Sequence, residues 1–333
     1  MPEDPINVSP APAISGLVFR HFRGEGDYPL MAAVVKASER PEEVQDEEIP
    51  GSIPNTPRVD PFQDMMLVEI HGELVGYARI AHINETEEER EYSLRGYLLP
   101  TWRHKGIGSA MLRWLEERAA EIERTHPDDK PGYFRAGAKQ HQDGLRNLLE
   151  RTGYQPIRYF HVMVRPTLDE IPNFPLPPGI DVRPANPEHY RAIWQTIIET
   201  AQDEWGYHPF SEEDYQAWSR FPSFQPHLWQ IAWETASGAV VGHVLTYIDQ
   251  AENEQANRKR GYTEGIGVVS TWRRRGLASA LIALSLQAQK AAGMEESGLV
   301  VDSENASGAF NLYERCGFRV VERNAVYRKR LSK

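Results

Sequence analysis

The sequence predicts an α/β protein with mixed sheets, made of two similar domains in tandem. Its 333 residues exceed the usual size of a single domain, so two domains of about 150 residues are expected. Short apolar segments typical of strands alternate with longer amphipathic segments typical of helices, such as 108–123 and 278–292. Three short motifs also occur twice in the same order, which indicates a duplicated fold.

The duplicated motifs keep nearly constant spacing between the two halves of the chain. The first pair has an offset of 271 − 101 = 170, the second of 242 − 76 = 166, and the third of 314 − 150 = 164. The small drift indicates loops of different length in one common fold. The matched segments are 101–110 with 271–280, 74–77 with 240–243, and 150–154 with 314–318.

A proline-rich stretch predicts the boundary between the domains. Residues 166–179 contain five prolines and end in Gly179. Proline has no backbone N–H, so this density blocks both helices and interior strands. We therefore expect an N-terminal domain at 1–165, a linker at 166–179 and a C-terminal domain at 180–333.

Charge and composition restrict the partners. The formal net charge of −11 disfavours nucleic acid and suits a cationic partner such as an amine, or it simply keeps the protein soluble. The single cysteine, Cys316, excludes an intramolecular disulfide. We see neither a signal-peptide pattern nor 18 consecutive apolar residues, so we expect a cytoplasmic protein without a membrane span.

A basic, glycine-containing turn predicts a phosphate site in the second half. The run Arg273-Arg274-Arg275-Gly276-Leu277-Ala278 lies between an apolar strand and a helix. Glycine lets the backbone approach a ligand closely, and the start of a helix offers unpaired N–H groups with partial positive charge. The alternative is a helix start with solvated arginines. Neither a Walker loop nor a dinucleotide-binding glycine pattern is present.

This turn resembles the pyrophosphate-binding signature of GNAT acetyltransferases, Arg/Gln-x-x-Gly-x-Gly/Ala. The pattern fits twice, at 103–108 and at 273–278. The family's second signature, an Asn followed by a helix ending in Leu-Tyr-x-x-x-Gly-Phe, fits 305–318. The resemblance covers nearly the whole chain as a tandem and is closest over 180–331. The overall plan is similar to that of the mycothiol synthases, tandem GNAT proteins whose C-terminal domain is active.

The resemblance implies that acetyl-CoA is the cosubstrate and that specific residues hold it. The Val268 N–H would bind the thioester carbonyl, and the amides of 274–279 would bind the pyrophosphate. Asn305 would contact the pantetheine arm, and Tyr313 would lie near the sulfur. The implied cosubstrate-binding residues of the C-terminal domain are Val268, Val269, Arg273, Arg274, Arg275, Gly276, Leu277, Ala278, Ser279, Asn305 and Tyr313.

Acetyl transfer to an amine needs a neutral nucleophile, so a base is useful. A lysine-like amine is uncharged in only about one molecule in 2,500 at pH 7. Glu264 lies four residues before Val268, and regular strand pleating would place both on one face. Gly265 and Gly267 would allow a β-bulge, which would place Glu264 and Val268 on opposite faces. The alternative is that Glu264 is a surface carboxylate without a catalytic role. Tyr313 would protonate the departing thiolate, or it is a core aromatic residue.

The N-terminal copy keeps the loop but not these candidates. Glu264 corresponds to Leu94 at the offset of 170, and at the offset of 164 Tyr313 corresponds to Leu149 and Asn305 to His141. This domain is therefore expected to bind CoA without catalysis, or to be a scaffold. Its implied binding residues are Leu98, Leu99, Arg103, His104, Lys105, Gly106, Ile107, Gly108 and Ser109.

The remaining candidate residues are not expected to take part in catalysis or metal binding. Cys316 lies at a helix C-terminus, where the dipole does not lower its pKa, so we expect a structural role. His208, His227 and His243 lack metal-ligand spacing and are expected to be surface or packing residues, and no metal is expected. The segment 203–207 would line the acceptor pocket or form a solvated helix end.

These patterns together predict direct acetyl transfer from acetyl-CoA to a primary amine in a ternary complex, with the C-terminal domain active. The acceptor is expected to be a small molecule. The alternatives are a peptide or protein N-acetyltransferase, a mycothiol-synthase-like enzyme, and a non-catalytic sensor that binds acyl-CoA.

Overall fold

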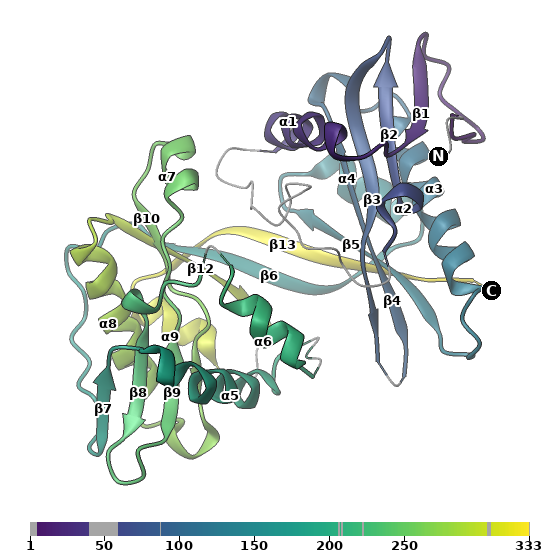
Figure 1. The fold of residues 1–333 in the computed structure, drawn as a ribbon. Coiled ribbons are helices and arrows are strands. Elements are labelled where there is room, and N and C mark those ends of the chain that lie inside the picture. Colours follow the sequence, from purple (N-terminus) through teal and green to yellow (C-terminus); the bar gives the residue numbers. More distant parts are fainter. Residues whose placement is uncertain are drawn as a thin grey trace. The chain divides into compact units, whose positions relative to one another are not determined.

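The computed structural model describes residues 5–39, 59–86, 88–205, 207, 209–221, 223–304 and 308–332. The chain divides into two compact units (Figure 1). Residues 1–158 and 324–333 make up the first, called the N-terminal unit below. Residues 159–323 make up the C-terminal unit.

The N-terminal unit contains a mixed sheet in which neighbouring strands run antiparallel, except that β4 and β5 run parallel. The last part of β13, residues 324–330, pairs antiparallel with β5. Its strands are β1 (Leu17–His21), β2 (Met65–Ile70), β3 (Glu73–Glu85), β4 (Arg90–Leu98), β5 (Gly132–Lys139) and the end of β13 (Arg319–Arg330).

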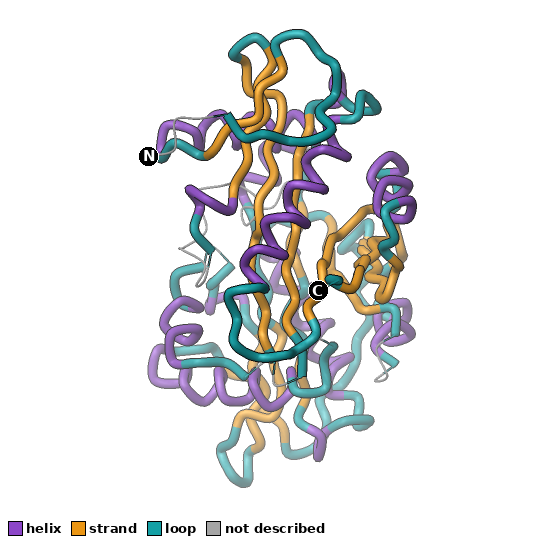
Figure 2. The backbone as a smooth tube through the Cα atoms, turned by 90° about the vertical axis from the view of Figure 1, so that its right-hand side faces the viewer, coloured by secondary structure: helices purple, strands orange, loops and turns teal. Residues whose placement is uncertain are grey.

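Helices cover both faces of this sheet. Met66 and Val68 of β2 pack in the same cluster as helix α3, whereas Met65 and Leu67 pack in a second cluster with α1. Successive strand residues point to opposite faces, so this alternation places the two helices on opposite sides. Helix α3 runs along the strands in Figure 2. The helices are α1 (Tyr28–Ser38), α2 (Pro61–Asp64), α3 (Ile107–Glu123) and α4 (Asp143–Arg151).

The C-terminal unit contains two groups of strands. An antiparallel sheet has the order β11-β9-β8-β7. A second group joins β10 and β12 in parallel, and β12 pairs antiparallel with residues 160–165 of β6. The strands are β6 (Gln155–Arg165), β7 (Ile180–Arg183), β8 (Gln230–Glu234), β9 (Val240–Val244), β10 (Arg260–Tyr262), β11 (Gly267–Val268) and β12 (Glu296–Asp302).

The helices of this unit also pack on two sides of its strands. Ile231 and Trp233 of β8 pack with Ile193 of α5, whereas Ala232 packs with Leu281 of α8. The helices are α5 (Tyr190–Ala201), α6 (Glu212–Trp218), α7 (Gln250–Ala256), α8 (Leu277–Ala291) and α9 (Ala309–Arg315).

Two strands are divided between the units, and this differs from the boundaries expected from the sequence. Residues 159–165 of β6 belong to the C-terminal unit because they pair with β12, as in Val164↔Gly298. Residues 324–330 of β13 belong to the N-terminal unit because they pair with β5, as in Tyr327↔Ala136. Each unit therefore takes a strand from the other half of the sequence.

The proline-rich segment 166–179 forms neither helix nor strand. It is nevertheless anchored to the C-terminal unit: Leu168 is buried in the core cluster, and its N–H donates to the Glu295 carbonyl at 2.9 Å. Ile171, Phe174 and Leu176 pack against the same core. The segment is thus part of this unit's packing.

Tyr327→Ala is expected to destabilise the N-terminal unit by about 3 kcal/mol, although residue 327 lies near the end of the chain. Tyr327 is 2% exposed in the N-terminal core, and its hydroxyl donates to Glu150 at 2.9 Å. Hydrogen exchange would show lost protection in β5 and α3. Val321→Ala, at a residue 62% exposed on the same strand, should change stability by less than about 0.5 kcal/mol. Lost protection confined to β12 and α8 would contradict this strand assignment.

Candidate functional site

The turn between β11 and α8 leaves the start of the helix open. Arg274 and Gly276 adopt positive φ values of 60° and 85°, and α8 begins directly afterwards at Leu277. The first i to i−4 bond of the helix runs from the Ala280 N–H to the Gly276 carbonyl at 3.1 Å. The amides of 277–279 therefore lack partners within the helix and carry the positive end of its dipole.

Two arginines on this turn are held by contacts on either side. The Arg273 Nε donates to the Val268 carbonyl at 2.9 Å, and its Nη1 donates to the Asp203 carboxylate at 2.7 Å. The Arg275 guanidinium lies 4.8 Å from the centre of the Trp272 ring. The turn is thus both positively charged and anchored, as an anion site requires.

The N-terminal unit repeats this turn in the same conformation. His104 and Gly106 have φ values of 61° and 85°, and the Arg103 Nε donates to the Leu98 carbonyl at 3.1 Å. Lys105 lies 4.5 Å from the Trp102 ring, as Arg275 does with Trp272. A positive φ is unfavourable for a residue with a side chain, so its presence in both units marks a shared loop structure.

The parallel strands next to each turn pair over only part of their length. In the C-terminal unit β10 pairs with β12, and Thr263 donates to the Gly298 carbonyl at 2.9 Å. Beyond this point the chain continues as β11, which pairs with β9 instead. In the N-terminal unit β4 pairs with β5 only from Arg90 to Ser93. Each unit therefore has a place where two parallel strands part.

Where the parallel strands part in the C-terminal unit, the N–H of Val268, which the sequence predicts to bind the thioester carbonyl, points away from β9. The Val269 N–H donates to the Val241 carbonyl of β9 at 3.0 Å. Because successive N–H groups point to opposite sides of a strand, the Val268 N–H points away from β9. Leu99 donates to Val75 at 2.9 Å in the N-terminal unit, so Leu98 has the equivalent orientation.

Glu264 lies where β10 and β12 part. Its Oε1 accepts the N–H of Val300 at 3.3 Å, and its carbonyl accepts the N–H of Leu245 at 2.8 Å. Burial, aided by the charge of Glu204 and opposed by the Val300 hydrogen bond, raises the pKa of this carboxyl from 4.5 to about 7. A carboxyl with this pKa is well suited to exchange protons near neutral pH.

Tyr313 of α9 lies within electrostatic reach of Glu264. The side chain is buried in the C-terminal core, 6.3 Å from the Phe318 ring. Burial raises the pKa of its phenol, and the charges of Glu264 and Glu204 raise it further. The hydroxyl therefore remains protonated at neutral pH. The fold brings the two residues predicted for acid–base chemistry into one region.

His243 is a buried member of this region whose connections the sequence did not reveal. It is 2% exposed, and its Nδ1 donates to the Gly265 carbonyl at 2.6 Å. Its Nε2 lies 3.1 Å from the Thr200 hydroxyl of α5. Burial lowers the pKa of His243 to about 4, so it is neutral and joins α5 to the residue after Glu264. A single histidine in an apolar strand gives no signal of this role.

Gly267 allows its strand to lie close to Thr200 and His243. A Cβ at Gly267 would lie 2.4 Å from the Thr200 hydroxyl oxygen and 2.5 Å from Nε2 of His243. Gly265 itself has a φ of 53°, which favours glycine. The two glycines near Glu264 therefore bend the strand and seat it against α5.

The N-terminal unit holds leucine at both corresponding positions. Leu149 accepts the N–H of Tyr154 at 3.0 Å, as Tyr313 accepts that of Phe318 at 3.0 Å. Leu94 pairs with Ile80 on β3, and both leucines are buried in the core. The N-terminal unit therefore combines a similar turn with apolar side chains at the positions of Glu264 and Tyr313.

The other residues singled out in the sequence are distributed as follows. Asn305 and His208 lie outside the described residues. Cys316 is buried, and burial raises its pKa to about 11, so the thiol stays protonated. His227 is exposed. In the part of the chain that the structure describes, no cluster of metal-ligating side chains is found, and no helix has the length and apolarity to span a membrane.

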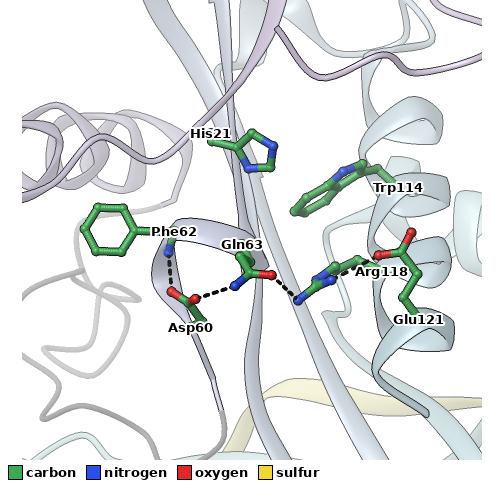
Figure 3. Close-up of a pocket in the computed structure, with 7 residues that line it drawn as sticks. All are labelled: His21, Asp60, Phe62, Gln63, Trp114, Arg118 and Glu121. Carbon is green, nitrogen blue, oxygen red and sulfur yellow. Dashed lines mark hydrogen bonds and ion pairs between the residues drawn. The ribbon is translucent and has the colours of Figure 1, made fainter. Parts of the chain in front are cut away.

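A cavity of about 680 Å³ lies in the N-terminal unit, away from the residues predicted from the sequence (Figure 3). Trp114 and Arg118 of α3 form one wall, and Phe62 lies across from them in Figure 3. Arg118 is bound by Asp64, Glu121 and Gln63. The lining residues are His21, Asp60, Phe62, Gln63, Trp114, Arg118 and Glu121.

Comparison with known proteins identifies relatives that match most of the chain. The model of the acetyltransferase (GNAT) family matches residues 31–126 and 194–318. A mycothiol acetyltransferase from Geodermatophilus obscurus is 27% identical over 262 residues, covering 77% of this chain and 79% of that protein. A GCN5-related N-acetyltransferase structure from Sphaerobacter thermophilus is 26% identical with a TM-score of 0.73, covering 95% of this chain and 96% of that chain.

A tandem GNAT protein from the clavulanic acid biosynthesis pathway has a TM-score of 0.66 at 16% identity, covering 95% of this chain and 99% of that chain. At this identity the likeness concerns the fold alone. The two matched segments and this neighbour confirm the mixed α/β fold and the tandem arrangement expected from the sequence.

Glu264→Gln is expected to change how stability depends on pH. The folded pKa of about 7 lies above the ordinary value of 4.5, so folding favours the protonated carboxyl. The contribution of this carboxyl to the free energy of unfolding is fully present below about pH 4.5. It falls by about 3 kcal/mol as the pH rises past 7. Urea unfolding at about pH 5 and about pH 8 measures this effect. Between these two pH values the free energy of unfolding should fall more for the wild type than for the variant.

The exposed carboxylate of Glu254 provides the control, because Glu254→Gln should follow the wild type at both pH values. An identical pH response of Glu264→Gln and the wild type would mean that Glu264 titrates as an ordinary exposed carboxylate.

Proposed function

The chain belongs to the GNAT family of acetyltransferases, and we propose that its C-terminal unit transfers an acetyl group from acetyl-CoA directly to a primary amine of a small molecule. Family membership makes it an acetyl-CoA-dependent N-acetyltransferase, which favours turnover over the sensor alternative. Relatives named mycothiol acetyltransferase support a small acceptor over a protein.

The open turn is where acetyl-CoA is proposed to bind. The amides of 274–279 would hold the pyrophosphate, with Arg273, Arg274 and Arg275 adding positive charge. The Val268 N–H, turned away from β9, would hold the thioester carbonyl and stabilise the oxyanion that forms on it. The Val269 N–H and carbonyl are already bound to Val241 and Trp272, so Val269 would adjoin the pantetheine arm without a backbone hydrogen bond to it. The two parted strands provide the place for that arm.

Glu264 carries the proposal, because its carboxyl lies at this same place with a pKa near 7. We assign it as the general base. It takes one proton from the ammonium form of the acceptor, and the freed lone pair attacks the thioester carbonyl carbon. The distance between Glu264 and the nitrogen is set by the acceptor, so the transfer is direct or passes through one water.

Tyr313 completes the proton balance. When the carbon–sulfur bond breaks, the thiolate takes the phenolic proton of Tyr313. The nitrogen's second proton passes to the resulting Tyr313 phenolate, and Glu264 releases the first proton to solvent, so both residues regain their starting state. The products are the N-acetyl amine, CoA thiol and one proton. A thiolate with a pKa near 8.5 leaves readily, so this acid should contribute less than the base.

The N-terminal unit is proposed to have no turnover of its own. Leu94 and Leu149 replace the base and the acid, so an amine there would stay protonated. Its turn, residues 103–109, has the same positive φ values as the turn proposed to hold the pyrophosphate in the other unit. We propose that it holds CoA without transferring the acetyl group.

Glu264→Gln is expected to lower kcat by at least about 100-fold, because the amide cannot accept the proton. Tyr313→Phe should lower kcat by only about tenfold. Release of CoA thiol from acetyl-CoA, with a panel of small primary amines, measures both rates. Glu254→Gln is the control and should retain wild-type turnover. Wild-type rates in the two site variants would remove both assigned roles.

Charge reversal on the two turns tests which unit holds the cosubstrate. Arg275→Glu should weaken acetyl-CoA binding by about tenfold or more, because a carboxylate then faces the pyrophosphate. Lys105→Glu should weaken any second, N-terminal site and leave kcat unchanged. Isothermal titration with acetyl-CoA separates the two sites. Weaker binding and slower turnover in Lys105→Glu alone would assign catalysis to the N-terminal unit.

A further inference from the structure

The last turn of α5 and the residues after it, 200–205, are fixed in place by contacts with three other parts of the C-terminal unit. The Thr200 hydroxyl lies 3.1 Å from Nε2 of His243, which in turn binds the Gly265 carbonyl. Asp203 accepts from Arg273 on the cosubstrate turn at 2.7 Å. The Trp205 ring lies 6.0 Å from the Phe160 ring of β6. Residues 200–205 are therefore anchored beside both Glu264 and the turn.

Glu204 lies between Asp203 and Trp205, and its side chain takes part in neither of their contacts. Its backbone N–H donates to the Ala201 carbonyl at 2.9 Å. Although the side chain is exposed at the end of the helix, the surrounding protein raises the pKa of its carboxyl by desolvation. Among the residues that the structure describes, none forms a hydrogen bond or ion pair with this carboxylate. Asp203, its neighbour, forms an ion pair with Arg273.

The groups that surround Glu264 make this place acidic. Burial raises the pKa of Glu264, and the negative charge of Glu204, in the extension of α5, raises it further. The phenol of Tyr313 comes from α9 and that of Tyr247 from the segment after β9. Burial raises the pKa values of both, and the charge of Glu264 raises them further. His243 is neutral beside Gly265. Two carboxyls, two phenols and a neutral imidazole favour a cation over a neutral or anionic ligand.

We propose that Glu204 is the acceptor-binding carboxylate of the C-terminal unit, which holds the substrate as an ammonium ion beside Glu264. This inference rests on the proposed function. It narrows the acceptors to primary amines that are cationic at neutral pH, and it excludes weakly basic aromatic amines as good substrates.

The assignment separates recognition from catalysis. At pH 7 nearly every aliphatic amine is an ammonium ion, so an enzyme that binds this form has access to the whole substrate pool. Glu204 forms a charge-assisted hydrogen bond with one ammonium N–H, while Glu264 accepts the proton of another. Once Glu264 has taken that proton, the amine is neutral and can attack the thioester.

Glu204→Gln is the test, with glucosamine, 2-phenylethylamine and 1,5-diaminopentane as acceptors and aniline as the weakly basic comparison. We expect the KM for the aliphatic amines to rise by about 10-fold to 100-fold, since a charge-assisted bond is lost. The kcat and the KM for acetyl-CoA should change by less than about threefold. The acidic limb of the kcat/KM profile should move slightly to lower pH, because burial still raises the pKa of Glu264 but the added effect of the Glu204 charge is gone.

Glu199→Gln, an exposed carboxylate on the same helix, is the matched control and should leave every constant unchanged. Glu204→Asp should restore part of the affinity. An unchanged amine KM in Glu204→Gln, or efficient use of aniline by the wild type, would overturn this inference and leave the proposed function intact. Failure of the wild type to release CoA with any of the four amines would instead overturn the proposed function.

Discussion

The site in the C-terminal unit depends on the point where two parallel strands stop pairing. Beyond Tyr262 and Thr263 the chain leaves β12 and joins β9, so the N–H of Val300 on β12 binds a side chain instead of a strand. That side chain is Glu264. A strand pair that continued would have filled this place with backbone hydrogen bonds and left the carboxyl outside.

The same geometry links the buried residues to the cosubstrate turn. His243 and Gly267 seat the bent strand against the end of α5, and the extension of α5 contacts Arg273 on the turn. The carboxyl pKa, the direction of the Val268 N–H and the anchored position of Glu204 thus share one structural cause. The N-terminal unit has the same strand separation and turn but apolar side chains, so its architecture alone does not provide the acid–base groups.

The sequence predicted the turns and the strand-to-helix context well, because short motifs such as 103–108 and 273–278 encode a local backbone path. Strand parity singled out Glu264, and the resemblance singled out Tyr313. The fold brings the two within electrostatic reach of each other. The sequence did not predict that β6 and β13 are each divided between the two units, because the residue pattern of a strand does not show which strand it pairs with. The roles of His243 and Glu204 depend on contacts between distant segments, which a lone histidine or a helix-end glutamate does not signal.

The most direct measurement is a crystal structure of the wild-type protein with acetyl-CoA. The account predicts the pyrophosphate on the amides of 274–279, with the thioester oxygen within hydrogen-bonding distance of the Val268 N–H and the acetyl group facing Glu264. An acetyl group found only beside Leu94 in the N-terminal unit, with the C-terminal turn empty, would contradict it.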